Sequence, residues 1–133
     1  MSRVMIVGCG RLGATLANVL LDRGDDVTIL DTNPEHFRRL RPRTTLHMFV
    51  GDGGSHETLR RTGIEGVEVF VAATGQDTTN ALAAQSAQIT FGVRSVICRV
   101  NDPVRRVMYE ELGLKTVSPT ETLASLALDA LGL

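Results

Sequence analysis

The sequence predicts an α/β fold in which a six-stranded parallel β-sheet carries helices on both faces. Three observations favour this fold. Short apolar segments typical of buried strands alternate along the whole chain with segments of helical periodicity. Proline or glycine marks the start or the end of most helical segments. A glycine-rich turn joins the first strand to the first helix, as in a βαβ unit.

The chain opens with a strand, a helix and a second strand. Residues 4–7 are apolar, and residues 11–23 place apolar side chains on one helical face. A second apolar strand covers residues 27–30. The sequence Thr32-Asn33-Pro34-Glu35 then predicts a second helix, with proline in its first turn and a capping box completed by Glu35.

The middle of the chain repeats this alternation. A third strand is expected over residues 46–50, followed by a short helix over 55–62. Residues 67–73 are almost wholly apolar and predict a fourth strand that is buried on both faces. An alanine-rich helix over 77–91 follows and ends before a glycine.

The last third adds two strands and two helices. A strand over 95–100 precedes a helix that starts at Asp102-Pro103, and a short strand covers 115–117. Ser118-Pro119-Thr120-Glu121 predicts a second capping box at the start of the last helix. With right-handed crossovers, the pattern predicts a Rossmann-type, doubly wound sheet of strand order 3-2-1-4-5-6, formed as one domain over residues 1–133.

Composition excludes several classes of protein. The net charge of −1 gives no field that would attract nucleic acid or a membrane surface, and no segment approaches the roughly 20 apolar residues that span a bilayer. The chain starts with a strand rather than a secretory leader, so we expect a reducing, cytoplasmic setting. Cys9 and Cys98 fall on strands that lie two positions apart, roughly 10 Å, which is too far for a disulfide. The histidines, His36, His47 and His56, lack metal-ligand spacing and are interpreted as solvated, and we expect no catalytic or metal site.

The glycine turn predicts a site for phosphate. It consists of Gly8, Cys9, Gly10, Arg11, Leu12 and Gly13. In this motif the first glycine allows a tight turn, the second lets backbone approach a phosphate, and the third lets the helix pack against the strand. The helix N-terminus offers unpaired N–H groups and a partial positive charge to an anion. Cys9 is interpreted as a small intervening residue rather than a reactive thiol.

The second and third strands end in acidic turns beside this motif. Asp31 follows the last glycine by eighteen positions, close to the spacing expected for a ribose-binding acid, and Thr32 comes next. A carboxylate there would repel a 2′-phosphate, so NADP is disfavoured. The alternative is a plain turn with Asp31 as a capping residue. Asp52 and Gly53 follow the third strand, where they suit an adenine edge or form a simple loop.

The fourth and fifth strands end at the same edge of the predicted sheet. Ala73, Thr74 and Gly75 follow the fourth strand, and Thr74 is either near phosphate and ribose or an N-cap of the next helix. Arg99 ends the fifth strand, where it is either a phosphate ligand or half of a surface ion pair. We find no residue suited to proton transfer opposite a nicotinamide, so the site indicates binding or sensing rather than half of an active site.

The last helix is more apolar than a surface helix requires. Its apolar face consists of Leu123, Leu126, Ala127, Ala130 and Leu131. Such a helix either covers its own sheet or makes a second contact, in a homodimer or with another partner. We favour the second contact.

Six segments together resemble the N-terminal lobe of RCK domains, also called KTN or TrkA-N domains. They are VMIVGCGRLGATLA, VTILDTNPE, VGDGG, VFVAATGQDTTNALAA, SVICRVNDPVRRVMYEELGL and TVSPTE, and the resemblance that they carry extends over nearly the whole chain. The resemblance implies binding of NAD(H) or of ATP, ADP or AMP rather than hydride transfer. It places Arg11 near the terminal phosphates, sometimes of a nucleotide in the neighbouring subunit. It matches Asp31 to the ribose acid, Asp52 to a residue near the adenosine, and Thr74 and Asn80 to the stretch after the fourth strand.

The resemblance also implies an assembly and a role. Family members form dimers that build into octameric rings beneath a membrane pore, and their last N-lobe helix crosses to the partner subunit. The implied function is a cytoplasmic regulatory module of a potassium channel or transporter, peripheral to the inner face of the membrane and without nucleic acid. Two departures bear on ligand choice: Gly53-Gly54 stands where relatives often have Ala-Thr, and Thr79 stands where an acid is common. The C-terminal lobe that usually follows in this family is absent from these residues.

Two other functions remain open from the sequence. One is the cofactor-binding domain of an NAD-dependent oxidoreductase. The other is a general NADH redox sensor that acts on another protein. Turnover of NADH with an electron acceptor would distinguish the oxidoreductase from either sensor.

Overall fold

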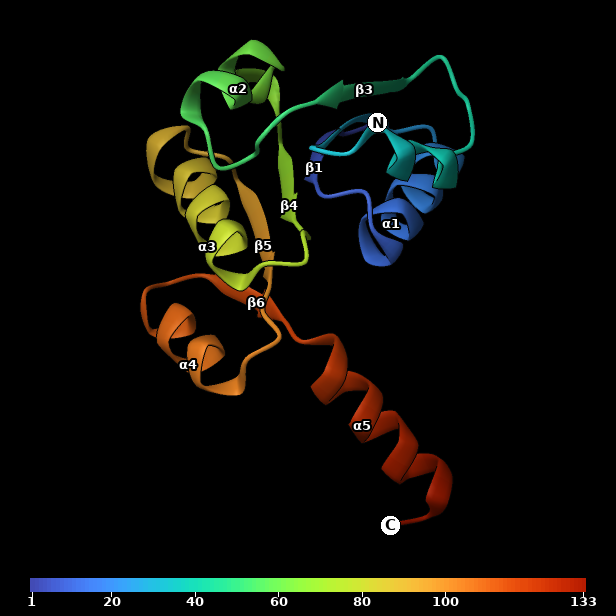
Figure 1. Cartoon of the computed structure of the whole chain (residues 1–133), viewed down its shortest axis with the longest axis vertical. Helices are drawn as coiled ribbons and strands as arrows, with labels where there is room; N and C mark the ends of the chain where they lie inside the picture. The colour runs from blue at the N-terminus through green and yellow to red at the C-terminus, as the bar shows by residue number, and fades with distance from the viewer.

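A computed structural model describes residues 1–133 and contains one six-stranded parallel sheet in the order β3-β2-β1-β4-β5-β6 (Figure 1). The strands are β1 (Arg3–Val7), β2 (Asp26–Asp31), β3 (Leu46–Val50), β4 (Val69–Ala72), β5 (Ser95–Arg99) and β6 (Lys115–Val117). All five neighbouring pairs are parallel, which confirms the predicted topology. Val7 pairs with Leu30 on one side and with Ala72 on the other. The turns that follow β1, β2 and β4 therefore meet at one edge of the sheet.

Helices cover both faces of the sheet (Figure 1). The α-helices are α1 (Arg11–Asp22), α2 (His56–Arg61), α3 (Asp77–Gln85), α4 (Pro103–Glu111) and α5 (Pro119–Leu131). Two short 3₁₀ helices, η1 (Pro34–Arg39) and η2 (Ile64–Gly66), and one π-helical turn, η3 (Ser86–Thr90), complete the chain. The helix predicted over 77–91 is thus α3 continued by η3.

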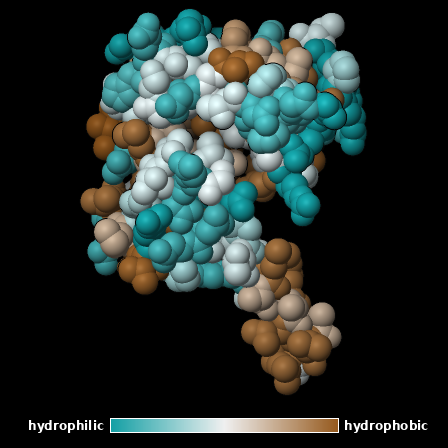
Figure 2. All heavy atoms as spheres, viewed as in Figure 1, coloured by the Kyte–Doolittle hydropathy of each residue, from teal (hydrophilic) through white to brown (hydrophobic).

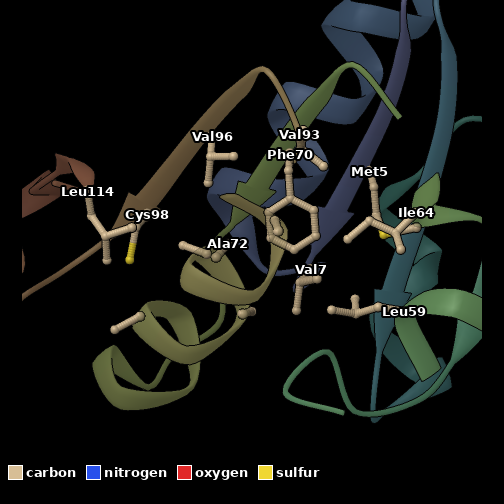
Figure 3. Close-up of a cluster of buried hydrophobic side chains, with 14 of the residues drawn as sticks. Met5, Val7, Leu59, Ile64, Phe70, Ala72, Val93, Val96, Cys98 and Leu114 are labelled. Atoms are coloured by element: carbon tan, nitrogen blue, oxygen red, sulfur yellow. The ribbon is translucent and has the colours of Figure 1, made fainter. Parts of the chain in front are cut away.

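Two apolar clusters hold the helices onto the sheet. Side chains alternate across a strand, so Met5 and Val7 face one cluster while Val4 and Ile6 face the other. The first cluster packs α2, η2 and α3 against Phe70 at its centre (Figure 3). The second packs α1 and η1 onto the opposite face. Because β1 is buried on both faces, its sequence is a continuous apolar run.

The second predicted helix is only a short 3₁₀ helix, and its capping box is wrong. Asn33, rather than the preceding threonine, is the N-cap, and its side-chain oxygen accepts a hydrogen bond from the Glu35 N–H at 3.0 Å. The Glu35 carboxylate pairs with Arg38 instead of returning to the N-cap. The helix ends at Arg39, where Leu40 is already extended with a ψ of 143°, and Pro42 disfavours a helical conformation for Arg41, the residue before it.

The capping box predicted for the last helix is also wrong. Ser118 is the N-cap of α5, but its hydroxyl is buried and has no hydrogen-bond partner. The Glu121 carboxylate lies 3.1 Å from the Arg106 Nε on α4. An ion pair between two helices has therefore replaced the local cap.

Helix α5 projects away from the sheet, so it does not cover its own domain (Figure 1). None of its residues is buried. Leu123 and Leu131 are 64% and 70% exposed, and apolar surface gathers on this helix in Figure 2. The alternative that α5 packs on its own sheet is therefore wrong. Neither α5 nor any other helix has the length and apolar character needed to cross a bilayer.

Candidate functional site

A cleft of about 610 Å³ lies at the carboxyl ends of the strands. It sits between the turns that follow β1 and β4, where the chain leaves to opposite faces of the sheet. Its volume falls within the range of about 300–1,000 Å³ typical of small-molecule sites. Only 3 of its 16 lining residues are hydrophobic, which suits a polar ligand. Ten predicted site residues line it: Gly8, Gly10, Asp31, Thr32, Asp52, Gly53, Ala73, Thr74, Gly75 and Arg99.

The glycines of the turn have the steric roles that the motif predicts. Gly8 has a φ of 102°, and a Cβ there would lie 2.7 Å from the backbone of Ala73 and Thr74. A Cβ on Gly13 would lie 1.9 Å from the carbonyl oxygen of Gly8. Around Gly10, by contrast, nothing lies within 4 Å of such a Cβ. Gly8 and Gly13 are thus required for packing, and Gly10 leaves the backbone of the cleft wall open.

Helix α1 begins at this wall without a cap. Its N-cap residue is Gly10, so no side chain caps the first turn, and that turn contains no acidic residue. The first intrahelical bond is from the Ala14 N–H to the Gly10 carbonyl, at 2.9 Å. The amides of Arg11, Leu12 and Gly13 therefore have no intrahelical acceptor, and the helix dipole adds positive potential. This arrangement can bind an anion.

The other members of the glycine turn lie outside the cleft lining. Arg11 is exposed and has no carboxylate within 4.0 Å. Leu12 packs against the apolar cluster beneath α1. Cys9 is buried, and burial together with the charge of Asp31 raises the pKa of its thiol to about 11. Cys98 is likewise buried, with a pKa of about 12, and both cysteines are free.

Asp31 closes the opposite side of the turn. Its Oδ2 accepts a hydrogen bond from the Cys9 N–H at 2.8 Å, and its Oδ1 accepts one from the Asn33 N–H at 2.8 Å. Burial would raise the pKa of this carboxyl, but these backbone hydrogen bonds and the neighbouring His36 outweigh it and hold the pKa below its ordinary value. Asp31 is therefore an anionic group that braces the turn while one side of it faces the cleft.

His36 was predicted to be solvated, and it is partly exposed, but it also has a place in the site that the sequence did not indicate. It lines the cleft, its side chain is 41% exposed, and its Nδ1 lies 3.1 Å from the Asp31 Oδ1. The short η1 helix turns residue 36 back toward the end of β2. The one signal in the sequence is its position five residues after Asp31. His47 and His56 stay at the surface, where they pair with Asp26 and Ser86.

Asn80 supports the cleft from behind. It is fully buried, and its Oδ1 accepts hydrogen bonds from the Thr74 N–H at 2.8 Å and the Thr74 hydroxyl at 2.6 Å. Its Nδ2 donates to the carbonyls of Thr74 and Arg99, both at 3.0 Å. Because Gln76 is the N-cap of α3, Thr74 does not cap that helix. Asn80 does not line the cleft, but it fixes two segments that do.

Arg99 carries a cation into the cleft wall. Its Nε donates to the Asn101 Oδ1 at 3.3 Å, and no carboxylate lies within 4.0 Å of its guanidinium. The alternative of a surface ion pair is therefore not realised. A cation without a carboxylate partner is available to a ligand that carries negative charge.

The turn after β3 forms the rim of the cleft. Asp52 is exposed, and its Oδ1 accepts a hydrogen bond from the Gly54 N–H at 2.8 Å. A Cβ on Gly53 would lie 2.2 Å from the Val7 side chain, so this turn sits too close to β1 for an alanine. The sequence did not indicate that Gln76 lines the cleft, and it indicated Thr79 only as a departure from the family pattern, although both line the cleft. No cluster of His, Cys, Asp and Glu suited to a metal ion is present.

Comparison with known proteins places the chain among relatives of known family. The TrkA-N domain model matches residues 4–119. The Trk system potassium uptake protein TrkA of Streptomyces coelicolor is 39% identical over 115 residues, which are 86% of this chain and 52% of that protein. The chain therefore spans about half the length of this curated relative.

Solved structures with the same fold include ligand-bound ones. The TrkA-N domain of the inner membrane protein ybaL from Escherichia coli has a TM-score of 0.85 at 19% identity, covering 98% of this chain and 96% of that one. The Kef CTD of Shewanella denitrificans in AMP-bound form has a TM-score of 0.80 at 21% identity, with 98% and 80% covered. GsuK bound to ADP has a TM-score of 0.76 at 22% identity, with 98% and 33% covered. On the family match and the sequence identity to TrkA, the chain belongs to the TrkA-N domain family.

Proposed function

We propose that this domain binds an adenine nucleotide, either NAD(H) or one of ATP, ADP and AMP, and that it is a regulatory module of a potassium channel or transporter. The observation that carries the proposal is the uncapped N-terminus of α1 at the wall of a polar cleft that Asp31 also lines. A helix N-terminus favours phosphate, and a carboxylate favours the hydroxyls of a ribose. The AMP and ADP in the solved relatives support the same ligand class.

The cleft divides into three parts in this proposal. Phosphates lie against Gly10 and the first turn of α1, with Arg99 on the far wall. The ribose lies at Asp31, and the adenine lies near Asp52. The family resemblance brings Arg11 to the terminal phosphates, and its exposed position leaves it able to reach a ligand in its own or a neighbouring subunit.

NADP is the disfavoured ligand. A 2′-phosphate at the ribose position would meet the Asp31 carboxylate, whose lowered pKa keeps it ionised. The neighbouring Thr32 and Asn33 supply no cation to compensate.

The proposed mechanism is a population shift in an assembly. A ligand stabilises whichever arrangement of subunits it binds better. Helix α5 is the contact that we propose for a homodimer, because Leu123, Leu126 and Leu131 are each more than half exposed on it. Larger rings would follow from further contacts. The partner is a membrane potassium channel or transporter subunit, and the domain lies on the cytoplasmic side of that membrane.

The experiment is a calorimetric and thermal-shift screen of NAD, NADH, NADP, ATP, ADP and AMP. The proposal predicts that at least one of the non-NADP ligands stabilises the protein, and failure of all of them would overturn it. Stronger stabilisation by NADP than by NAD would contradict the role of Asp31. Arg11→Ala should weaken ATP more than AMP, while equal losses would contradict its phosphate role.

The second candidate function is the cofactor domain of an oxidoreductase. The glycine turn and Asp31 are common to both functions. Steady NADH oxidation with an electron acceptor such as ferricyanide would favour the oxidoreductase. Binding without turnover would favour the regulatory module.

A further inference from the structure

His36 and Asp31 form a pair inside the proposed ribose position. Both side chains line the cleft, and the His36 Nδ1 lies 3.1 Å from the Asp31 Oδ1. An ionised carboxylate only accepts hydrogen bonds, so Nδ1 is the donor. The Asn33 side-chain amide lies 3.4 Å from the other ring nitrogen, Nε2, which is consistent with Nε2 as an acceptor. The Nδ1 proton of His36 is thus directed at the Asp31 carboxylate.

The pair leaves little of the Asp31 carboxylate open. A carboxylate offers about four acceptor positions, two on each oxygen. On Oδ1, one position is taken by the Asn33 N–H and the other by His36. On Oδ2, one position is taken by the Cys9 N–H. A single position, on Oδ2, remains for a ligand.

A ribose diol needs more than this. Two adjacent hydroxyls bind a carboxylate best with one hydroxyl on each oxygen, and Oδ1 has no free position for the second hydroxyl. The donors from Cys9 and Asn33 are backbone N–H groups, of the glycine turn and of the local turn after β2, so neither is displaced without a change in the path of the backbone. The His36 side chain is 41% exposed and can rotate into solvent.

We propose that His36 is a specificity-determining residue of the nucleotide site, which occupies the Asp31 Oδ1 in the free protein and is displaced by the ribose diol. The inference rests on the proposed nucleotide function and adds that His36 competes with the ligand for the Asp31 carboxylate. The competitor lowers affinity for ligands that carry both ribose hydroxyls. His36 does not lower the affinity for a ligand that lacks the two ribose hydroxyls, since that ligand makes no hydrogen bond to the Asp31 Oδ1.

The test compares ATP with 2′,3′-dideoxy-ATP in the wild type and in His36→Ala, by isothermal titration calorimetry. The variant should bind ATP about 3- to 10-fold more tightly, as expected for loss of one competing hydrogen bond to a partly exposed carboxylate. Its affinity for dideoxy-ATP should stay within about 2-fold of the wild type on the same reasoning. The preference for ribose over dideoxyribose therefore increases in the variant.

Two further variants control for bulk and for general electrostatics. His36→Phe keeps a ring at the cleft rim without the donor, so it should also increase the preference for ATP over dideoxy-ATP. His47→Ala removes the other histidine–carboxylate pair, in which His47 Nε2 lies 2.9 Å from the Asp26 Oδ1 at the opposite end of the sheet. It should change neither affinity.

Other outcomes overturn the inference. If His36→Ala weakens ATP binding, His36 contacts the ligand instead of competing with it. If ATP and dideoxy-ATP gain equally, His36 only obstructs the cleft. If ATP does not bind but ADP, AMP or NAD does, the comparison is made with that nucleotide and its dideoxyribose analogue. If none of NAD, NADH, ATP, ADP and AMP binds to the wild type or to any variant, the proposed nucleotide function itself fails.

Discussion

Replacement of Asn80 by alanine should destabilise the domain more than any comparable change at its surface. The side chain is fully buried and makes four hydrogen bonds, which join the Thr74 turn to the end of β5. Alanine leaves the Thr74 N–H, the Thr74 carbonyl and the Arg99 carbonyl without this partner. A buried group without a partner costs about 1–3 kcal/mol. Water from the cleft can reach part of the gap, so we expect a loss of about 2–4 kcal/mol in the free energy of unfolding.

The assay is thermal and urea unfolding of both proteins without ligand. The unfolding entropy of a 133-residue domain is about 0.28 kcal/mol/K, so the Tm should fall by about 7–14 °C. The matched control is Asn18→Ala. Asn18 also bridges two backbone groups, those of Arg39 and Arg41, with both distances at 3.0 Å, but these bonds lie in exposed surroundings and should cost less than about 1 kcal/mol. An Asn80 variant no less stable than the Asn18 variant would refute the reasoning.

Three further predictions follow from the same geometry. Gly13→Ala should lower the free energy of unfolding by more than about 3 kcal/mol or prevent folding, because its Cβ would lie 1.9 Å from a carbonyl oxygen. Gly10→Ala, which has no such contact, should unfold at nearly the wild-type temperature in thermal melts. Equal melting temperatures of the two variants would contradict this prediction. The pKa of Asp31 is lowered in the folded protein, so its stabilisation is present above its unfolded pKa of about 3.9 and is lost as the pH falls through the folded value. The difference in stability between the wild type and Asp31→Asn in urea melts should therefore be larger at pH 7 than at pH 3. A difference that does not change with pH would contradict this prediction. The buried thiols of Cys9 and Cys98 have pKa values raised to about 11 and 12, so a disulfide reagent at pH 8 should label neither in the native protein and both in urea. Rapid labelling of either cysteine in the native protein would contradict this burial.

Most of the fold follows from local patterns in the sequence. Central strands are buried on both faces, so their apolar runs are visible without any structure, and right-handed crossovers then leave one natural strand order. The 34–39 segment was overestimated as a helix, because Pro42 limits it and only Phe37 and Leu40 supply apolar contacts. The direction of α5 had no local signal, since an apolar face looks the same whether it packs on its own sheet or on another chain.

The candidate site was predictable where chain geometry fixes the spacing. The βαβ unit sets Gly8, Gly13 and Asp31 in place, and all three lie around the turn as predicted. His36 was missed because a 3₁₀ helix directs a residue five positions after Asp31 differently from the α-helix that the sequence predicted. The inward role of Asn80 depends on the exact path of the Thr74 turn, which no spacing rule specifies.

The most direct test of the central claim is the change in the backbone amide NMR spectrum of the protein on titration with ATP and with NAD. If the cleft binds a nucleotide, the largest shifts should fall on the first turn of α1, at Gly10 to Gly13, and on the turns at Asp31 and Thr74, with saturation. Shifts confined to α5, or a spectrum unchanged at millimolar concentration by any of ATP, ADP, AMP and NAD, would contradict the account.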